Sequence, residues 1–554
     1  MTLPADDTDV RGRAARDQER FLLRPAVWLV FAAFLSFSLV IYVRFSSDSL
    51  IYIDVAKNLT SGRGLSTFIL NLDSKSVPDR VLLWPPLYPI SLAIPIWMGL
   101  GSLWAVRVVN ILSFMASAVN VYLIGRAIRS SGFGTVCLIV WLFMSPFMGI
   151  WSNAMSDALY VAVSSTLLVL LARGVSRDLA TFSLLITGVL AGLATLGRYL
   201  GVACVLTAIG VLLLQLCTQR YRRKFGKVLF GCLCVTIGFG VLAAPWFLRN
   251  LILSGNFEGL RKPLPVEGFA TNAYRLLRTL GVDLVLPLSV VLTLLGLSPV
   301  GNVKSALSRL RPPTEKAAMM LAVAGMWTAV YVICLFVMIS RNQVTGIYTR
   351  FLCPAYAGLI PLLLHFGYGA YAEPQKSSIV QSKLALRIVL LLLLALMVCR
   401  TGVSLHRLRK TAGPWPLEKW IGESVPKDAL FIGNRVWWIR FKTGRPVVET
   451  SHEVYPEWPD LSAGRLVRFL DAHGSKFTSV LLVIPNGEMA SEHPDPAMIT
   501  DAGNPGPIAK TAPKASHLLV ELNGLGLDFS LKYSDDCYQV YHCSGPTNSP
   551  VFSR

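Results

Sequence analysis

The chain has 554 residues, of which 53% are hydrophobic and only 15% are charged, and its mean hydropathy is +0.54. Soluble globular proteins carry about 25% charged residues, so this composition excludes an ordinary soluble enzyme and indicates an integral membrane protein. The net charge of +20 does not indicate nucleic-acid binding, because much of the Lys and Arg lies in short stretches between apolar segments, where topology signals are found.

The amino-terminal residues 1–24 are polar and basic, and we expect them to form a cytoplasmic tail. The next segment, Pro25–Val43, is long enough to cross a bilayer, and no small-residue cleavage site follows it, so we expect an uncleaved first span. Ten more apolar segments are predicted spans: residues 103–125, 134–151, 157–173, 180–197, 200–217, 228–248, 282–298, 317–339, 351–368 and 386–402. The sequence therefore predicts an α-helical membrane domain of about eleven spans over residues 25–403.

The first loop, residues 44–102, begins with the stretch S-D-S-L-I-Y-I-D-V-A-K-N-L-T-S-G-R-G-L. Ser47 is the predicted N-cap of a helix, and Asp48 lies in its first turn, where a carboxylate interacts favourably with the helix dipole. The spacing of apolar and polar residues is typical of a short helix in a membrane interface. Gly62 and Gly64 are expected to end this helix.

Later in the same loop, Trp84–Leu100 is apolar but contains four prolines. Prolines remove backbone donors that lipid cannot replace, so we interpret this stretch as interfacial or re-entrant. Counting it as a span would place the basic cluster at residues 220–227 outside, whereas eleven spans keep the basic loops inside. The loop 44–102 and all residues after 403 are therefore predicted to be extracytoplasmic, in a protein of the inner cell membrane.

The carboxyl-terminal residues 404–554 contain many Pro, Gly and charged residues and no spanning run. Strands at Leu430–Ile432 and Val480–Ile484, with a helix at Leu466–His473, predict a small α/β domain. Cys537 and Cys543 lie in this region. A straight strand would hold them about 20 Å apart, so a disulfide would need a turn between them.

The first-loop pattern D-S-x-x-Y-x-x-x-A-x-N-L-x-x-G-x-G-L, followed by P-P-L-Y-P, resembles the GT-C superfamily. These polytopic glycosyltransferases use polyprenyl-phosphate-linked sugars, and the resemblance is strongest to the bacterial branch near the protein O-mannosyltransferases and lipid A glycosyltransferases. It covers the loop residue by residue and the rest of the chain in architecture. The loop aspartate of that family is catalytic, which implies a catalytic Asp48; the alternative is that Asp48 only begins a helix.

Four more ionisable residues lie at the outer ends of predicted spans, and such residues are functional candidates because desolvating them is costly. They are Asp157 in S-D-A-L-Y, Arg198 in L-G-R-Y-L-G, Arg249 in P-W-F-L-R-N and Arg350 in Y-T-R-F-L-C-P. The resemblance implies a catalytic acidic residue at Asp157 and a lipid-phosphate contact at Arg350. The alternatives are a helix-capping carboxylate and a cation that reaches the headgroups.

The chemistry implied by the resemblance is the transfer of a sugar to a hydroxyl of a lipid, glycan or protein acceptor, with inversion. Asp48 would accept the proton of that hydroxyl. Arg198, Arg249 and Arg350 would contact the phosphate of the leaving group, and Tyr52, one turn from Asp48, would orient it or anchor the interface.

The chain departs from the lipid A branch at Leu83-Trp84-Pro85, where that branch carries an acidic residue and a lysine linked to metal and phosphate binding. Metal dependence is therefore an open question, although Asp48 and Asp157 could hold a divalent cation with waters. Two other functions are compatible with a polytopic protein: a lipid-linked glycan transporter or flippase, and a polysaccharide polymerase or ligase of another fold. A transporter would predict internal repeats and broken helices at the membrane midplane, and the sequence contains no such repeat.

Overall fold

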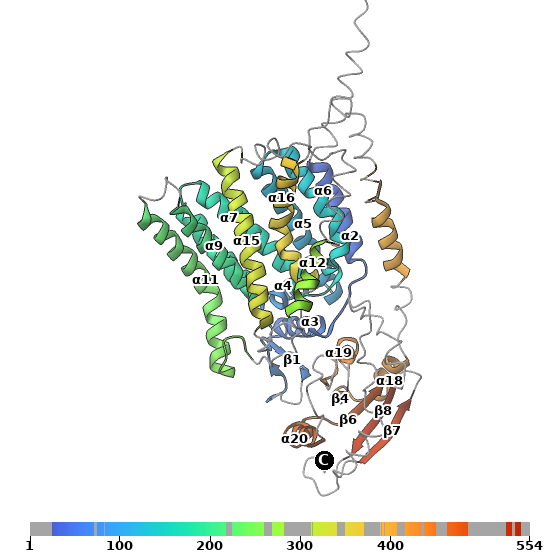
Figure 1. Cartoon of the computed structure of the whole chain (residues 1–554). Helices are drawn as coiled ribbons and strands as arrows, with labels where there is room; N and C mark the ends of the chain where they lie inside the picture. Colours follow the sequence, from blue (N-terminus) through green and yellow to red (C-terminus); the bar gives the residue numbers. More distant parts are fainter. Residues whose placement is uncertain are drawn as a thin grey trace, which may run out of the picture. The chain divides into compact units, whose positions relative to one another are not determined.

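The computed structural model describes residues 25–70, 75–81, 84–217, 224–259, 269–281, 312, 314–340, 349–370, 388, 391–392, 394–406, 416–433, 437–449, 463–485, 528–534 and 538–544 (Figure 1). The chain forms two compact units. The helical unit comprises residues 1–41, 107–152 and 156–403, and the sheet unit comprises residues 42–106, 153–155 and 404–554. The first loop thus belongs to the same compact unit as the carboxyl-terminal residues, although hundreds of residues separate them in the sequence.

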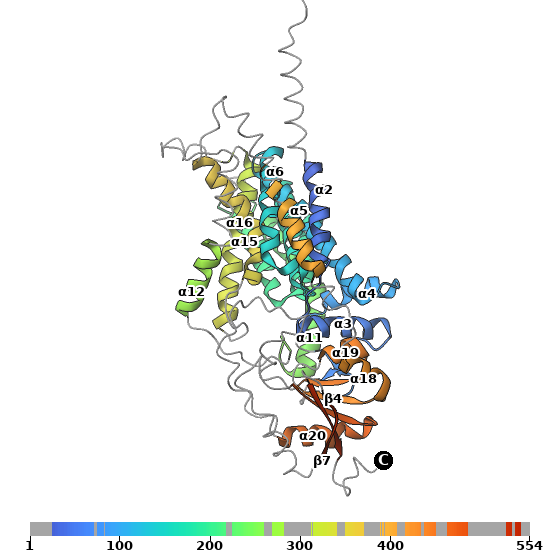
Figure 2. The same cartoon turned by 90° about the vertical axis from the view of Figure 1, so that its right-hand side faces the viewer.

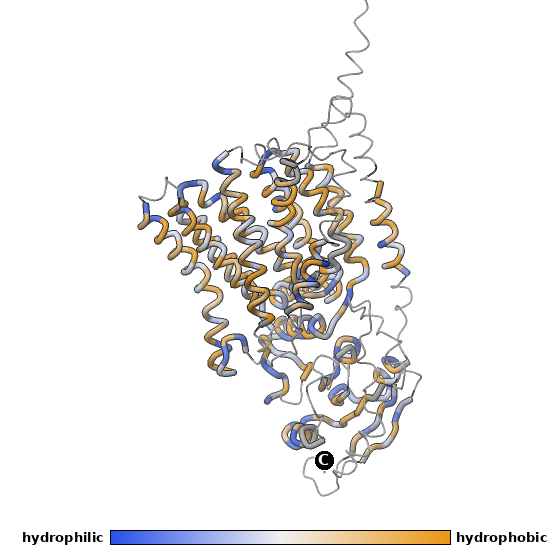
Figure 3. Tube along the Cα trace, viewed as in Figure 1, coloured by the Kyte–Doolittle hydropathy of each residue, from blue (hydrophilic) through white to orange (hydrophobic). Residues whose placement is uncertain are grey.

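The helical unit consists of apolar helices that run side by side (Figures 1 and 2). They are α2 (Pro25–Val40), most of α5 (Ser102–Ile128), α6 (Ser131–Met148), α7 (Asp157–Ser176), α8 (Thr181–Gly197), α9 (Val202–Gln215), α11 (Phe225–Ser254), α15 (Glu315–Ser340) and α16 (Thr349–Ala370). The unit also contains α12 (Phe269–Arg278), a shorter amphipathic helix. Apolar residues cover the helices along most of their length (Figure 3). Large apolar side chains such as Phe34, Val241 and Ile252 remain more than half exposed on the unit's surface, as expected for helices surrounded by lipid.

The apolar helices of the helical unit lie where the sequence predicted spans, and α12 lies between two predicted spans. One predicted span cannot be compared with the structure. The predicted span 282–298 lies outside the described residues, and the last predicted span, 386–402, is represented by the apolar helix Leu394–His406. Four of the described helices are long and apolar enough to cross a membrane: Ser102–Ile128, Asp157–Ser176, Phe225–Ser254 and Glu315–Ile339. The total of eleven spans stays a prediction.

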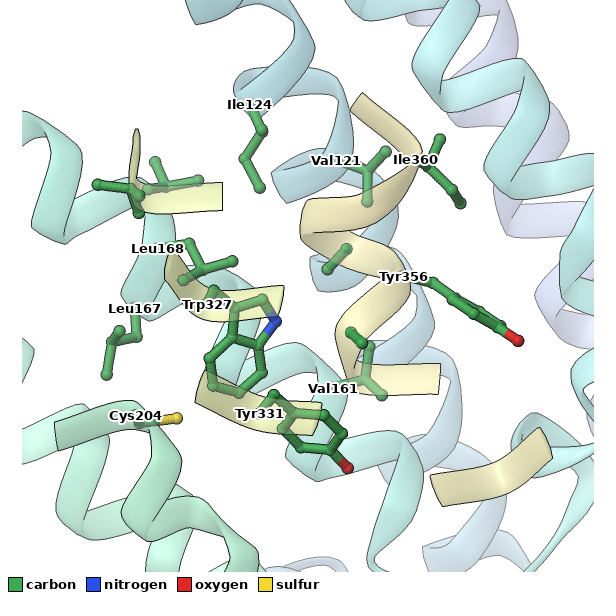
Figure 4. Close-up of a cluster of buried hydrophobic side chains, with 14 of the residues drawn as sticks. Val121, Ile124, Val161, Leu167, Leu168, Cys204, Trp327, Tyr331, Tyr356 and Ile360 are labelled. Atoms are coloured by element: carbon green, nitrogen blue, oxygen red, sulfur yellow. The ribbon is translucent and has the colours of Figure 1, made fainter. Parts of the chain in front are cut away.

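The core of the helical unit joins α7, α9, α15 and α16. Figure 4 shows Trp327 and Tyr331 of α15 among side chains of the neighbouring helices, including Val161, Leu167, Leu168, Cys204, Tyr356 and Ile360, all of which are buried. Trp327 Nε1 donates to the Pro354 carbonyl at 3.0 Å, and the Tyr331 hydroxyl donates to the Phe351 carbonyl at 2.6 Å. These two bonds hold the first turns of α16, and therefore Phe351, against α15.

A second close contact, between α8 and α11, depends on glycine. A Cβ atom on Gly188 would lie 2.1 Å from the Val235 carbonyl oxygen, and one on Gly238 would lie 2.3 Å from the Leu185 carbonyl oxygen. Both distances are far below van der Waals contact, so only glycine lets these backbones approach so closely. The end of α8 leads directly to Arg198, so this contact brings α11 beside a candidate site residue.

The sheet unit is built on a six-stranded sheet with strand order β2-β5-β4-β6-β8-β7. The strands are β2 (Ile69–Leu70), β4 (Leu430–Gly433), β5 (Val447–Glu449), β6 (Val480–Pro485), β7 (Asp528–Ser534) and β8 (Tyr538–Ser544). The first four in spatial order are parallel, and β8 and β7 are antiparallel additions. The unit also contains α18 (Pro416–Ser424), α19 (Trp437–Thr443), α20 (Ala463–His473) and a small pair of β1 (Ser66–Thr67) with β3 (Asp79–Arg80).

Strands β4 and β6 and helix α20 lie where the sequence predicted them. Strand β2 was not predicted: it comes from the first loop and pairs in parallel with β5, with Ile69 opposite Val447. The pairing of Cys537 with Cys543 cannot be compared, because Cys537 lies outside the described residues. The domain boundaries and the side of the membrane stay predictions.

Helix α3 (Ser47–Thr60) opens the sheet unit, and its N-cap differs from the prediction. Ser46, not Ser47, is the N-cap: its backbone is extended, and its hydroxyl accepts a hydrogen bond from the Ser49 amide while the Ser49 hydroxyl accepts one from the Ser46 amide. Adjacent serines satisfy the N-cap preference equally, and only the backbone conformation distinguishes them. The helix ends at Thr60, before Gly62, whose φ of 76° suits glycine. Helix α4 (Leu87–Trp97) has 11 residues, too few to span a bilayer.

Candidate active site

The helical unit brings together an acidic residue and an arginine that lie far apart in the sequence. Asp157 is the first residue of α7 and is only 2% exposed. Arg198 lies between α8 and the short turn Tyr199–Gly201, and its guanidinium forms an ion pair with the Asp157 carboxylate. The two candidates therefore act as one group, in which the carboxylate holds the arginine in place.

Phe351 connects this ion pair to a second arginine. The guanidinium carbon of Arg198 lies 5.2 Å from the centre of the Phe351 ring, and that of Arg350 lies 4.8 Å from it. Both distances are within the range of a cation–π interaction. Two guanidiniums with one carboxylate leave an excess of one positive charge, which matches the electrostatic need of a phosphate group.

Arg249 lies in a neighbouring polar cluster on α11. Its guanidinium lies 4.7 Å from the Trp246 ring and donates to the Asn250 side-chain oxygen at 3.2 Å. Trp246 Nε1 and Asn250 Nδ2 both donate to the Tyr199 hydroxyl, each at 3.2 Å. Because Tyr199 directly follows Arg198, this cluster continues the group formed by Asp157, Arg198 and Arg350.

The two remaining candidates, Asp48 and Tyr52, lie in the sheet unit, on α3. Asp48 is partly exposed in the first turn of the helix, as predicted, and residues four apart share one face of a helix. Tyr52 is 4% exposed, and its ring contacts that of Tyr88 edge to face, with the centres 5.3 Å apart. Tyr88 belongs to the W-P-P-L-Y-P motif, so the two halves of the first-loop pattern pack against each other.

Sequence reasoning assigned no role to the aromatic and amide side chains that hold the arginines: Tyr199, Trp246, Asn250 and Phe351. A signal for two of them was present, because Arg198 and Arg350 are each followed directly by an aromatic residue and a leucine. Trp246 and Asn250 have no such signal, since the packing of α11 against α8 decides their position. Among the described residues, no group of three or more His, Cys, Asp or Glu could hold a metal ion.

Comparison with known proteins supports the resemblance seen in the sequence. Residues 84–246 match the family model described as dolichyl-phosphate-mannose-protein mannosyltransferase. A search of curated proteins finds no match. Among solved structures, ArnT from Cupriavidus metallidurans in the apo state is 13% identical, with a TM-score of 0.58 over 96% of this chain and 98% of that one.

The same enzyme bound to undecaprenyl phosphate is 14% identical, with a TM-score of 0.57 over 93% of this chain and 97% of ArnT. The archaeal oligosaccharyltransferase AglB from Archaeoglobus fulgidus, in complex with an inhibitory peptide and a dolichol-phosphate, is 11% identical, with a TM-score of 0.46 over 82% and 69% of the two chains. The likeness to ArnT extends along nearly the whole chain and shows a common fold. The predicted resemblance to the GT-C superfamily is confirmed.

Proposed function

We propose that this protein is a membrane glycosyltransferase that moves a sugar from a polyprenyl-phosphate-linked donor to an acceptor hydroxyl outside the cytoplasm. The observation that carries the proposal is the pair of arginines, Arg198 and Arg350, on one phenylalanine ring beside a buried aspartate. This arrangement is suited to a phosphate at a membrane surface. The matching family model and the ArnT fold, seen with undecaprenyl phosphate bound, support the same donor class.

In the proposed reaction the acceptor oxygen attacks the anomeric carbon of the sugar, and its proton passes to the Asp48 carboxylate. The bond between that carbon and the phosphate oxygen breaks on the opposite face, so the configuration inverts. The polyprenyl phosphate leaves with the bonding electrons, and Arg198 and Arg350 stabilise the charge that develops on it. Asp157 orients Arg198, while Arg249 and Tyr52 contact the substrates.

The test is sugar transfer by membranes that contain equal amounts of each variant, with a panel of labelled undecaprenyl-phosphate hexoses and pentoses as donors. Asp48→Asn keeps the size of the side chain and removes the base, so we expect transfer to fall by about 10²–10⁴ with donor binding unchanged. Arg350→Ala removes a phosphate contact and should weaken donor binding as well as turnover.

Matched controls are Asp79→Asn, in the same loop, and Arg278→Ala, an exposed arginine of the helical unit; both should transfer sugar at the wild-type rate. Transfer near the wild-type rate by Asp48→Asn would reduce Asp48 to a residue that begins a helix. A wild-type protein that transfers sugar from none of the donors would refute the proposed function.

A further inference from the structure

A buried aspartate on α3, Asp54, lies on the same helix as Asp48 and is 5% exposed. Three donors satisfy its carboxylate. Oδ2 accepts from the Thr67 hydroxyl at 2.9 Å and from the Phe68 amide at 2.7 Å, and Oδ1 accepts from Arg440 Nε at 2.7 Å. Two of these donors come from the first loop, and the third comes from the carboxyl-terminal part of the chain.

Arg440 lies on α19, and its surroundings leave it little freedom. Its side chain is 13% exposed, its guanidinium carbon lies 4.6 Å from the centre of the Phe68 ring, and it also donates to the Gly444 carbonyl. The next residue, Phe441, contacts the ring of Phe45 with centres 5.1 Å apart. Helix α19 therefore meets the first loop through an ion pair, a stacked ring and an aromatic pair.

The residues that follow α19 are also held in place by hydrogen bonds. Arg445, two residues after the end of α19 and 7% exposed, donates to the Ile421 and Val425 carbonyls at 3.0 and 2.6 Å, at the end of α18. The backbone adds a further connection, because the Val447 amide donates to the Phe68 carbonyl at 3.1 Å where β5 pairs with β2. Hydrogen bonds thus join the residues after α19 to the end of α18, and they join the carboxyl-terminal sheet to the first loop.

We propose that Asp54 and Arg440 are positioning residues, which hold α3 against the carboxyl-terminal sheet and so determine how Asp48 is presented to the substrates. The effect of this positioning on catalysis rests on the proposed function. A buried ion pair adds little to stability compared with apolar packing, but it can specify one arrangement. Here the Asp54 carboxylate is satisfied only when the strand after Thr67 and helix α19 are both in place.

The geometry of the helix explains how a contact at Asp54 acts on Asp48. The two residues are six positions apart on α3, so about 9 Å separates them along the axis, and they point to different faces. Asp54 therefore does not share the surface that Asp48 presents. A tilt of the helix at Asp54 would still move Asp48, and a displacement of about 1 Å at a reacting group can lower the rate about 100-fold.

The test replaces Arg440 in the full-length protein, once by a neutral residue and once by another cation. We expect Arg440→Gln to lower kcat for sugar transfer about 10- to 100-fold while KM for the undecaprenyl-phosphate sugar stays within about twofold, because donor binding does not involve this residue. Arg440→Lys keeps a cation within reach of Asp54 and should recover most of the rate. The control is Lys442→Gln on the same helix, which removes an exposed cation 3.6 Å from Glu418 and should change little.

A double-mutant cycle assigns the effect to the pair. Asp54→Asn retains an oxygen for the Thr67 and Phe68 donors, so the double variant Asp54→Asn with Arg440→Gln should be no slower than the slower single variant. Additive losses would show that the two residues act separately and would overturn the proposal. Wild-type kcat in Arg440→Gln, or a loss that Arg440→Lys does not recover, would overturn it as well.

Hydrogen exchange separates this inference from the proposed function. Amides of residues 47–60 and 66–70 should exchange faster in Arg440→Gln than in wild type and Lys442→Gln, whether or not any donor sugar is transferred. Faster exchange in a protein without transferase activity would refute the function and leave the positioning of α3 standing. Unchanged exchange of these amides in an active enzyme would refute the positioning of α3 by Arg440 and leave the proposed function standing.

Discussion

Replacing Arg198 by Gln is expected to destabilise the helical unit as well as to impair transfer, and the two effects can be separated. In the wild type, Arg198 forms the ion pair with Asp157, and the exposed fractions of the two side chains are 20% and 3%. Breaking a buried pair by removing one partner costs about 3–5 kcal/mol, because the other charge stays buried without compensation. Asp157 is almost inaccessible to water, so Arg198→Gln should reach the upper part of that range.

The converse variant should be milder. Asp157→Asn leaves an arginine whose side chain is one-fifth exposed and whose guanidinium still lies on the Phe351 ring, so we expect a loss of about 1–3 kcal/mol. In the double variant both charges are gone and two amides can bond to each other, so stability should return to within about 1–2 kcal/mol of wild type. Transfer should nevertheless remain at least about tenfold reduced, since a charge-assisted hydrogen bond contributes about 1.5–3 kcal/mol.

The assay is thermal unfolding of the four proteins in detergent, followed by tryptophan fluorescence, together with sugar transfer at equal protein levels. Arg278→Gln, which changes an exposed arginine of α12, serves as the control for loss of a positive charge. A double variant as unstable as Arg198→Gln would show that the buried charge is not the cause. A double variant as active as wild type would show that Arg198 does not contact the phosphate.

Two other predictions concern packing and protonation. Gly188→Ala places a methyl group 2.1 Å from the Val235 carbonyl oxygen, so α8 and α11 must separate, and we expect a loss of about 1–3 kcal/mol in thermal unfolding. Gly240→Ala on α11 meets no atom within 4 Å and should be neutral; equal losses in both variants would contradict the packing argument. Burial, and to a smaller extent the charge of Arg440, lowers the pKa of Lys57 against the opposing effect of Asp54. The Lys57 amine therefore loses its proton at a lower pH than the amine of a free lysine does. The rate of Lys57 acetylation, followed by mass spectrometry, should reach half its maximum at a pH below that measured for free Nα-acetyl-lysine amide. A midpoint at or above that pH would contradict the lowered pKa.

The sequence by itself was sufficient for the class of the protein and for most of its helices. Long apolar runs leave few alternatives, because backbone groups in lipid must be satisfied within each segment, and the apolar helices of the helical unit follow those runs. The first-loop pattern was sufficient to predict the resemblance to the GT-C superfamily. It also placed Asp48 in the first turn of a helix, since capping depends on neighbouring residues only. Even there, the choice between Ser46 and Ser47 depended on the backbone and could not be predicted.

Tertiary structure decided what surrounds each candidate residue. The ion pair of Asp157 with Arg198 and the two arginines on Phe351 join segments that lie tens to hundreds of residues apart, and no local pattern encodes such contacts. The two-residue strand β2 has no periodicity to reveal it, because its pairing with β5 depends on a partner nearly 400 positions away. Asp54 shows the difference most clearly. In the sequence it is one polar residue of an amphipathic helix, and only the approach of Thr67, Phe68 and Arg440 gives it three hydrogen bonds and a place in the interior.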